Sequence, residues 1–238
     1  MYFNTQKNQA GFSLIEMMIA MVIGLFLMGG VVSVYINSSQ SSRVNQSMRT
    51  LQENGRFALS SLRNNIQMAG YVDSYDSEDA IDPFPNADNS FFEKLTVRFQ
   101  ADQDCVGADT TATHGGFAEN TLEIVNGELI CTGNAGGAAA PQTIITGVDQ
   151  MQILYGLDDG GDGVADRYVS ATTVTTNAGW KESVTSVRIA LLLNSEQDIK
   201  PAAESKPYPL LDGNSANFND RKLHKVFTST ILIRNQMK

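Results

Sequence analysis

The short segment from Asp158 to Asp166 is rich in aspartate, and its residue types and spacing suit calcium binding. Aspartates stand at the first, fifth and ninth places of the pattern D-x-D-x-D-G-x-x-D, which presents oxygen ligands to Ca²⁺ from a glycine-containing turn. The third place is Gly160, which has no side-chain oxygen, so Asp159, the Val164 carbonyl or water would have to complete the ligand shell. The same residues are also typical of a hairpin turn, and both interpretations stay open. The ligands expected for Ca²⁺ are Asp158, Asp162, Asp166 and the carbonyl oxygen of Val164.

A second place for chemistry is Gly11, a small residue directly before a long apolar run. An ordinary secretory signal is cut at small residues that follow its apolar segment. A cut after Gly11 would instead leave the apolar segment on the mature protein, with Phe12 as its new amino terminus. An uncleaved signal anchor is the alternative.

Glu16 is the only charged residue between Phe12 and Ile36, a run of 25 residues. Because about 20 apolar residues span a bilayer, the run predicts a transmembrane helix, and an acid inside such a helix indicates a function. After a cut at Gly11, the Glu16 carboxylate could neutralise the amine of Phe12, which is costly to bury alone. That amine could belong to the same chain or to a neighbouring helix staggered by one axial step. The second geometry would select correctly registered neighbours.

The chain has two cysteines, Cys105 and Cys131, both well beyond the apolar run. If Lys7 keeps the leader in the cytoplasm, as the positive-inside rule favours, both thiols reach an oxidising compartment. A disulfide is expected there, and its loop of about 25 residues would remove on the order of 3 kcal/mol of unfolded-state entropy. Two free thiols are the alternative. The spacing fits neither a CxxC redox motif nor a zinc site.

The elements that position these residues begin with a long helix. Beyond Ile36 the chain becomes polar, yet apolar residues recur at helical spacing. The membrane helix is therefore expected to continue as one amphipathic rod from Phe12 to Ala69. Gly70 stands where helices commonly end on a glycine. The apolar stripe of the continuation consists of Val44, Met48, Leu51, Ala58, Leu62 and Ile66.

Short apolar and β-branched runs after the helix predict strands. Residues 73–89 are acidic and contain prolines, which indicates a surface connection. Residues 105–142 indicate loops with short hairpins, and three prolines between 201 and 209 indicate an excursion before the last strand. A long N-terminal helix packed on an antiparallel sheet is an α+β architecture. The predicted strands are Leu95–Phe99, Thr121–Val125, Thr143–Thr146, Val148–Tyr155, Arg167–Ser170, Val184–Leu193 and Val226–Ile233.

The charge balance and the histidines argue against two classes of protein. The net charge is −9, and loss of Lys7 with the leader would leave 16 basic and 26 acidic side chains, or −10. Nucleic-acid binding is disfavoured, because such binders commonly carry a basic surface. The two histidines, His114 and His224, belong to no metal-spaced cluster, and the chain has no nucleophile-elbow or phosphate-loop motif. The sequence therefore predicts a protein that is not an enzyme.

The string GFSLIE at residues 11–16 closely resembles the class III signal of type IV prepilins. In that family a prepilin peptidase cuts after the glycine and methylates the new terminal phenylalanine, which implies cleavage at Gly11 and methylation of Phe12. The resemblance also implies the type IV pilin fold and gives Glu16 a role in pairing with a neighbouring subunit. The implied segments are a leader at 1–11, a transmembrane and assembly helix at 12–36, its amphipathic continuation at 37–70, and a periplasmic globular β-rich head at 71–238.

Glycines inside the apolar helix leave its local structure open. Gly24, Gly29 and Gly30 permit close helix approach in lipid, and each weakens a helix by up to about 1 kcal/mol. Many major pilins have a helix-breaking proline in this region, whereas residues 1–82 contain none. Local unwinding on packing into a filament is an alternative to a continuous helix.

The head resembles the PilW group of minor pilins in its size, in the sequence DGVADRY at residues 162–168, and in its closing strands. The resemblance implies a structural protein that acts with other minor pilins to initiate pilus assembly, in or near the tip complex. The sequence leaves open whether the biological output is twitching motility, adhesion, DNA uptake or secretion. It implies a single-pass inner-membrane protein with a periplasmic C-terminal head, which later enters the extracellular pilus. The implied partners are other minor pilins, the major pilin, a PilY-type tip adhesin, prepilin peptidase and the inner-membrane assembly platform.

Two other functions fit parts of the same sequence. A J-like minor pseudopilin of a type II secretion system has a nearly indistinguishable leader. A membrane-anchored periplasmic binding module or enzyme could also begin with this string. Genomic neighbourhood would separate the first from a pilus protein, and processing by prepilin peptidase would separate the second.

Overall fold

The computed structural model describes residues 11, 13–73, 84, 94–112, 114–135, 140–175, 180–211, 213 and 215–236. The chain divides into two compact units, Met1–Gln46 and Ser47–Lys238. The described part of the first unit is almost entirely helical, and every strand that the structure describes belongs to the second unit.

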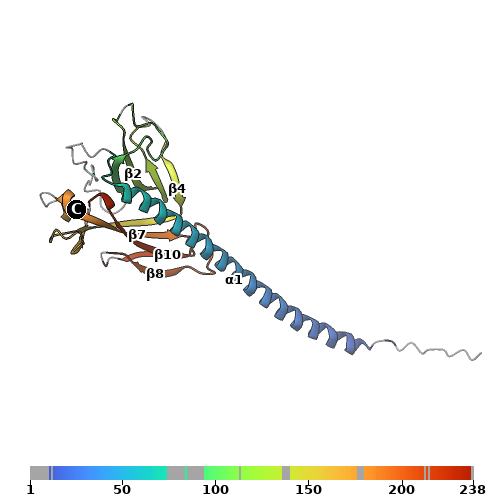
Figure 1. Ribbon diagram of the computed structural model, residues 1–238. Helices are drawn as coiled ribbons and strands as arrows, with labels where there is room; N and C mark the ends of the chain where they lie inside the picture. Colours follow the sequence, from blue (N-terminus) through green and yellow to red (C-terminus); the bar gives the residue numbers. More distant parts are fainter. Residues whose placement is uncertain are drawn as a thin grey trace, which may run out of the picture. The chain divides into compact units, whose positions relative to one another are not determined.

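A single helix, α1 (Leu14–Met68), begins in the first unit and ends in the second (Figure 1). It ends before Gly70, whose φ of 75° is a left-handed conformation that suits glycine. The predicted start at Phe12 lies outside the described residues, while the predicted end at Ala69 is wrong by one residue. Among the helices that the structure describes, α1 alone is long and apolar enough to span a membrane.

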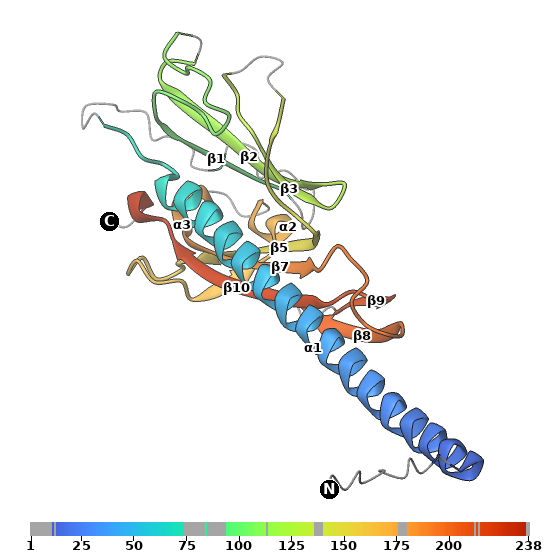
Figure 2. The same ribbon diagram turned by 90° about the vertical axis from the view of Figure 1, so that its right-hand side faces the viewer.

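Within the second unit, α1 buries one stripe of side chains and lies along strand β10 (His224–Leu232), as Figure 2 shows. Leu51, Ala58, Leu62 and Ile66 are all at most 2% exposed, as the helical spacing predicted. Gly55 belongs to the same stripe, and a Cβ atom there would lie 2.6 Å from the ring of Phe227. The helix can approach β10 this closely because residue 55 has no side chain.

The first sheet is an antiparallel meander in the order β1-β2-β3-β4. A two-residue turn, Asn126-Gly127, joins β2 to β3, and both residues have positive φ, 53° and 79°. Such φ values are required by a tight hairpin turn of type I′. The strands are β1 (Lys94–Gln100), β2 (Phe117–Val125), β3 (Glu128–Thr132) and β4 (Gln142–Thr146).

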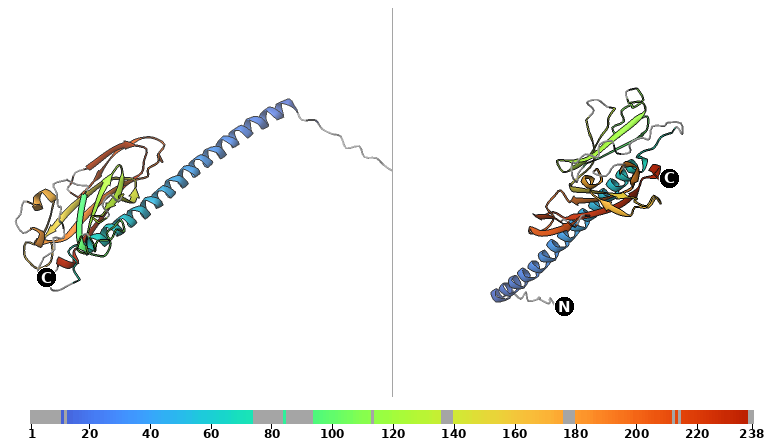
Figure 3. Two further views of the ribbon diagram at one scale, coloured as in Figure 1. Left: turned by 90° about the horizontal axis from the view of Figure 1, so that it is seen from above. Right: turned by 90° about the vertical axis from the view of Figure 1, so that its left-hand side faces the viewer.

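The second sheet has the order β10-β7-β5-β6, and every pairing is antiparallel. Strand β7 is central and almost continuously buried, which is why its sequence is an apolar run rather than an alternation. The two four-stranded sheets are separate (Figures 2 and 3), and their inner faces contribute to the core beside α1. The remaining strands of this sheet are β5 (Val148–Leu157), β6 (Arg167–Val169) and β7 (Val184–Asn194).

The excursion predicted around the prolines is a hairpin of two strands, β8 and β9. Pro207 and Pro209 lie in β8, where a strand with only one partner tolerates residues that lack an N–H donor. The predicted α+β class is confirmed, with two four-stranded sheets and this hairpin where the sequence indicated one sheet. The remaining elements are β8 (Glu204–Pro209), β9 (Ser215–Asp220), α2 (Ala171–Thr175), α3 (Trp180–Ser183) and the 3₁₀ helix η1 (Arg234–Gln236).

Candidate assembly site

Helix α1 begins at Leu14, three residues after Gly11. The Ser13 carbonyl accepts hydrogen bonds from the N–H groups of Glu16, at 3.1 Å, and Met17, at 3.2 Å. Glu16 lies in the first turn, where a carboxylate interacts favourably with the positive end of the helix dipole. Gly11 and Glu16 are both exposed. Phe12, the predicted site of methylation, lies outside the described residues.

The apolar part of α1 is exposed, with no partner among the residues that the structure describes. No residue in its most apolar 18-residue window is buried, and Phe26 is 80% exposed. Apolar surface on this scale marks contact with a membrane or another protein. The predicted transmembrane segment therefore has the surface that such a role requires.

Glycines make a shallow apolar notch on this part of the helix. A Cβ atom at Gly24, Gly29 or Gly30 would meet no atom of another described residue within 4 Å, so no contact in the described parts of the chain requires glycine there. Small residues on an apolar helix let a second helix approach closely. The notch is lined by Val22, Leu25, Phe26, Gly29 and Gly30, which share one helix face.

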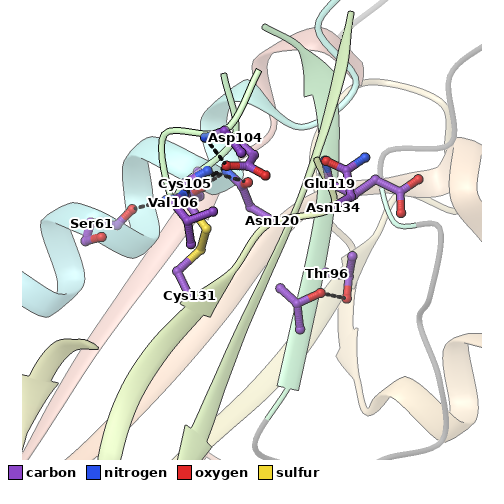
Figure 4. Close-up of a disulfide and its surroundings, with 12 residues drawn as sticks. Ser61, Thr96, Asp104, Cys105, Val106, Glu119, Asn120, Cys131 and Asn134 are labelled. Carbon is purple, nitrogen blue, oxygen red and sulfur yellow. Dashed lines mark hydrogen bonds between the residues drawn. A yellow bond between two sulfur atoms is a disulfide. The ribbon is translucent and has the colours of Figure 1, made fainter. Parts of the chain in front are cut away.

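A disulfide joins Cys105 to Cys131, as the sequence predicted, with the Cα atoms 6.3 Å apart (Figure 4). The Cys105 N–H donates to Asn120 Oδ1 at 2.9 Å, and Asn120 Nδ2 donates to Asn65 Oδ1 at 2.8 Å. Because Asn65 belongs to α1 and Asn120 to β2, the disulfide loop is connected to both the sheet and the helix.

The Asp104 carboxylate organises the same loop. It accepts hydrogen bonds from the N–H groups of Val106 and Ala108, both at 3.0 Å, and of Ala135, at 2.9 Å. Asp104 is only 7% exposed, and any side chain at Gly133 would overlap its carboxylate. This buried acid therefore acts as a structural centre for the loop that the disulfide closes.

The segment from Asp158 to Asp166 connects β5 to β6, which pair from Leu157 and Arg167 onward. Two oxygens of Asp158 accept backbone hydrogen bonds, from Gly161 at 2.5 Å and from Gly163 at 2.7 Å. The hydrogen bond from Gly163, with those of neighbouring amides, outweighs desolvation and lowers the pKa of Asp158. The segment is therefore a hairpin connection whose first aspartate caps the turn.

The other carboxylates of this loop are also engaged. Asp166 Oδ2 accepts from the N–H groups of Asp159, at 2.8 Å, and Gly160, at 3.1 Å. Asp159 forms an ion pair with Arg167 at 2.7 Å, and the hydrogen bond in this pair lowers the pKa of Asp159. Among the residues that the structure describes, no three His, Cys, Asp or Glu side chains are grouped to hold a metal ion. Calcium binding by Asp158, Asp162, Val164 and Asp166 stays a prediction.

A buried histidine between two carboxylates is a cluster that the sequence did not reveal. His224 Nδ1 lies 2.8 Å from Asp149 Oδ2, and His224 Nε2 lies 3.0 Å from both oxygens of Asp220. The His224 side chain is 1% exposed, and its ring stacks on Phe218 at 4.7 Å. Burial raises the pKa of Asp220, but the hydrogen bond from His224 and nearby donors and positive charges hold it below its usual value. The cluster links β5, β9 and β10.

An exposed apolar helix beginning just after a glycine, with an acid in its first turn, and an antiparallel β head define a type IV pilin-like protein. The prokaryotic N-terminal methylation motif matches residues 6–32. The sequence model of the Type IV Pilus-assembly protein W matches residues 111–235, more than half of the chain, and the chain belongs to this family.

A solved structure described as a type IV-like pilin from Thermus thermophilus is similar, with 14% sequence identity and a TM-score of 0.45. The similarity covers 79% of this chain and 97% of that one. No curated protein sequence matches the chain.

Proposed function

We propose that this chain is a minor pilin that takes part in initiating type IV pilus assembly and lies in or near the pilus tip. The observation that carries the proposal is the exposed apolar helix, which begins three residues after Gly11 and has Glu16 in its first turn. Membership in the pilus-assembly protein W family supports the same role. Its role is structural, and a separate machine supplies the energy.

In this function prepilin peptidase cuts after Gly11 and methylates the amine of Phe12. The mature protein crosses the inner membrane once with its head in the periplasm, and later enters the extracellular pilus. Its partners are other minor pilins, the major pilin, a PilY-type tip adhesin and the inner-membrane assembly platform. The family match supports this set of partners in preference to those of a secretion pseudopilin.

Glu16 is proposed to pair with the methylated amine of a neighbouring subunit. The glycine notch at Gly29 and Gly30 supports the geometry, because it lets a second helix lie close to the same apolar segment. Away from water, an unpaired amine or carboxylate is costly, so correctly staggered neighbours are favoured. Pairing within one chain is the alternative, and it would give no such selection.

The loop from Asp158 to Asp166 is proposed to bind Ca²⁺ weakly. Asp158 Oδ1 and Asp166 Oδ2 lie on the same side of the turn, each 3.8 Å from the Cβ position of Gly160. Both already accept backbone hydrogen bonds, so an ion would have to share these oxygens. Affinity toward the millimolar range of extracellular modules is expected.

The test of this function starts with processing. Protein from a host that contains prepilin peptidase should begin at N-methyl-Phe12 by mass spectrometry, and Gly11→Val should block the cut. An intact Met1 in that host would contradict the proposal.

The assembly step is tested by replacing Glu16 with glutamine, which keeps the shape and removes the charge. The variant should insert and fold normally but be strongly depleted from sheared pili. Glu53→Gln is the matched control, because Glu53 is the other acidic residue of α1 and lies outside the apolar segment. Equal depletion of both variants would refute a specific role for Glu16. A tip location predicts that a PilY-type adhesin co-purifies with the protein.

A further inference from the structure

Charge is divided unevenly between the helix and the head. Residues 37–68 contain four arginines and one glutamate, a net charge of +3, whereas residues 69–238 contain 12 basic and 24 acidic side chains, a net charge of −12. A basic helical segment in an acidic protein is a local feature that the overall charge of −9 hides.

Three of these arginines, Arg49, Arg56 and Arg63, form a row along α1 that we call the arginine row. They are seven residues apart, and seven residues make almost two full helical turns, so the side chains share one face. With a rise of 1.5 Å per residue, neighbouring guanidinium groups start about 10 Å apart. All three residues are exposed, and the buried stripe of α1 lies on a different face.

The arginine row has no acidic partner within the described parts of the chain. Among the residues that the structure describes, no ion pair involves any of the three arginines, although carboxylates of the head pair with Lys94, Arg98, Arg167 and Lys200. Arg63 Nη2 donates to Ser229 Oγ of β10 at 3.2 Å, which fixes one end of the row beside the sheet. Within the described residues, this is the one hydrogen bond that the three arginine side chains donate, and guanidinium groups bind carboxylates with two parallel hydrogen bonds.

We propose that the arginine row docks on the acidic head of a neighbouring pilin subunit. The proposal rests on the proposed function, because it requires other subunits beside α1. Charge complementarity favours an acidic surface as the partner, and the head of this chain, with 24 acidic and 12 basic side chains in residues 69–238, is one pilin head with such a surface. Carboxylates about 10 Å apart along that surface would meet the arginines in one register.

Anionic lipid headgroups are the poorer partner for the same charges. Arg49 is already 13 residues beyond Ile36, the last residue of the apolar run. The attraction of a charged membrane surface fades within a Debye length, about 8 Å at physiological salt. Along a helix, 13 residues extend about 20 Å.

Zero-length crosslinking tests the contact directly. Arg56→Lys keeps the positive charge and gives a primary amine, which a carbodiimide joins to a carboxylate in contact with it. The full chain is expressed in piliated cells, and sheared pili are treated with carbodiimide and mapped by mass spectrometry. We expect an amide between Lys at position 56 and an Asp or Glu in the head of another protein that carries the N-terminal methylation motif. Amides only within the chain, or none at this position, would overturn the proposal.

Charge reversal tests the energetic contribution. Changing Arg49, Arg56 and Arg63 together to glutamate should lower incorporation into pili about tenfold, since three exposed pairs each contribute a factor of about two. Arg234→Glu is the control for a single reversal, because Arg234 is also exposed and forms no ion pair within the described residues. Arg56→Glu should be depleted about twofold relative to Arg234→Glu. Equal incorporation of the two would contradict the inference.

The outcomes separate this inference from the proposed function. If wild-type protein is not processed or is absent from pili, the proposed function fails and the row has no pilin partner. If wild type enters pili and the triple variant enters equally well, only the arginine row is refuted. The melting temperature of each variant in detergent must match that of the wild type, and a variant that fails this check is replaced by the corresponding Arg→Gln set.

Discussion

Opening the Cys105–Cys131 disulfide should destabilise the head by about 3 to 4 kcal/mol. The two cysteines are 26 residues apart in sequence. For a loop of about that length, the crosslink removes roughly 3.5 kcal/mol of chain entropy from the unfolded state at 25 °C. Cys105→Ala with Cys131→Ala removes the crosslink without adding a polar group beside Cys131, which is 2% exposed. In a protein of this size, such a loss corresponds to a fall of about 10 °C in melting temperature.

The measurement is thermal and urea unfolding of the full chain in detergent, followed by near-ultraviolet circular dichroism. Wild-type protein treated with a reductant should fall to nearly the stability of the double variant, because both lack only the crosslink. The double variant itself should not respond to the reductant. A loss below about 1 kcal/mol would refute the reasoning, since it would mean that the loop is already constrained in the unfolded state.

Three further perturbations test other parts of the structure. Gly55→Val should cost about 1 to 3 kcal/mol by overlap with the ring of Phe227, and a Phe227→Ala background should remove most of that cost in urea unfolding. Millimolar CaCl₂ should raise the melting temperature of the wild type, but not of Asp162→Ala, relative to EGTA. The free energy of unfolding should rise by about 2.7 kcal/mol when the Ca²⁺ concentration is one hundred times Kd. Identical wild-type melting curves in CaCl₂ and EGTA would mean that the loop is a hairpin turn without a calcium site. The hydrogen bond to His224 lowers the pKa of Asp220 in the folded protein. The ionised Asp220 side chain therefore contributes fully to the free energy of unfolding above its unfolded pKa of about 3.9, and this contribution is lost as pH falls through its folded pKa. Asp220→Asn should therefore lose less stability than wild type between about pH 5 and pH 3, and parallel pH profiles would contradict this assignment.

The pattern of apolar residues along the sequence was sufficient to predict the long helix α1 and the central strand β7. The spacing of Leu51, Ala58, Leu62 and Ile66 predicted the buried face of α1, because a helix presents every third or fourth residue to the same side. The apolar run at Val184–Leu193 predicted a strand, and the structure shows that this strand, β7, is buried and lies inside its sheet between β10 and β5. Both predictions depend on local sequence alone.

Two hairpins were harder to predict. The region before Gln142 is rich in glycine, alanine and threonine, which concealed β3, although Asn126-Gly127 is a strong hairpin signal. Pro207 and Pro209 suggested an excursion, whereas pairing with β9 makes their segment a strand. Prolines exclude central strands and permit edge strands, so composition alone could not decide.

The contacts of individual polar residues depend on long-range topology. His224 and Asp220 are four residues apart, but Asp149 is 75 residues from His224 and reaches it only because β5 and β10 flank β7. The pairing of Cys105 with Cys131 was predictable because the chain offers no other partner. His224 had many possible partners, and its burial could not be inferred from its neighbours in sequence.

The start of α1 at Leu14 determines how many residues would precede the helix in a protein cut after Gly11. A cut after Gly11 leaves only Phe12 and Ser13 before the helix, and the Ser13 carbonyl already accepts two backbone hydrogen bonds. Ordering a flexible tail costs about 1 to 2 kcal/mol per residue, and a tail this short leaves little to order. Such a cut would therefore place the amine two residues before a hydrogen-bonded helix. If the amine pairs with Glu16 as proposed, moving the glycine several residues upstream should weaken that pairing without changing either charge.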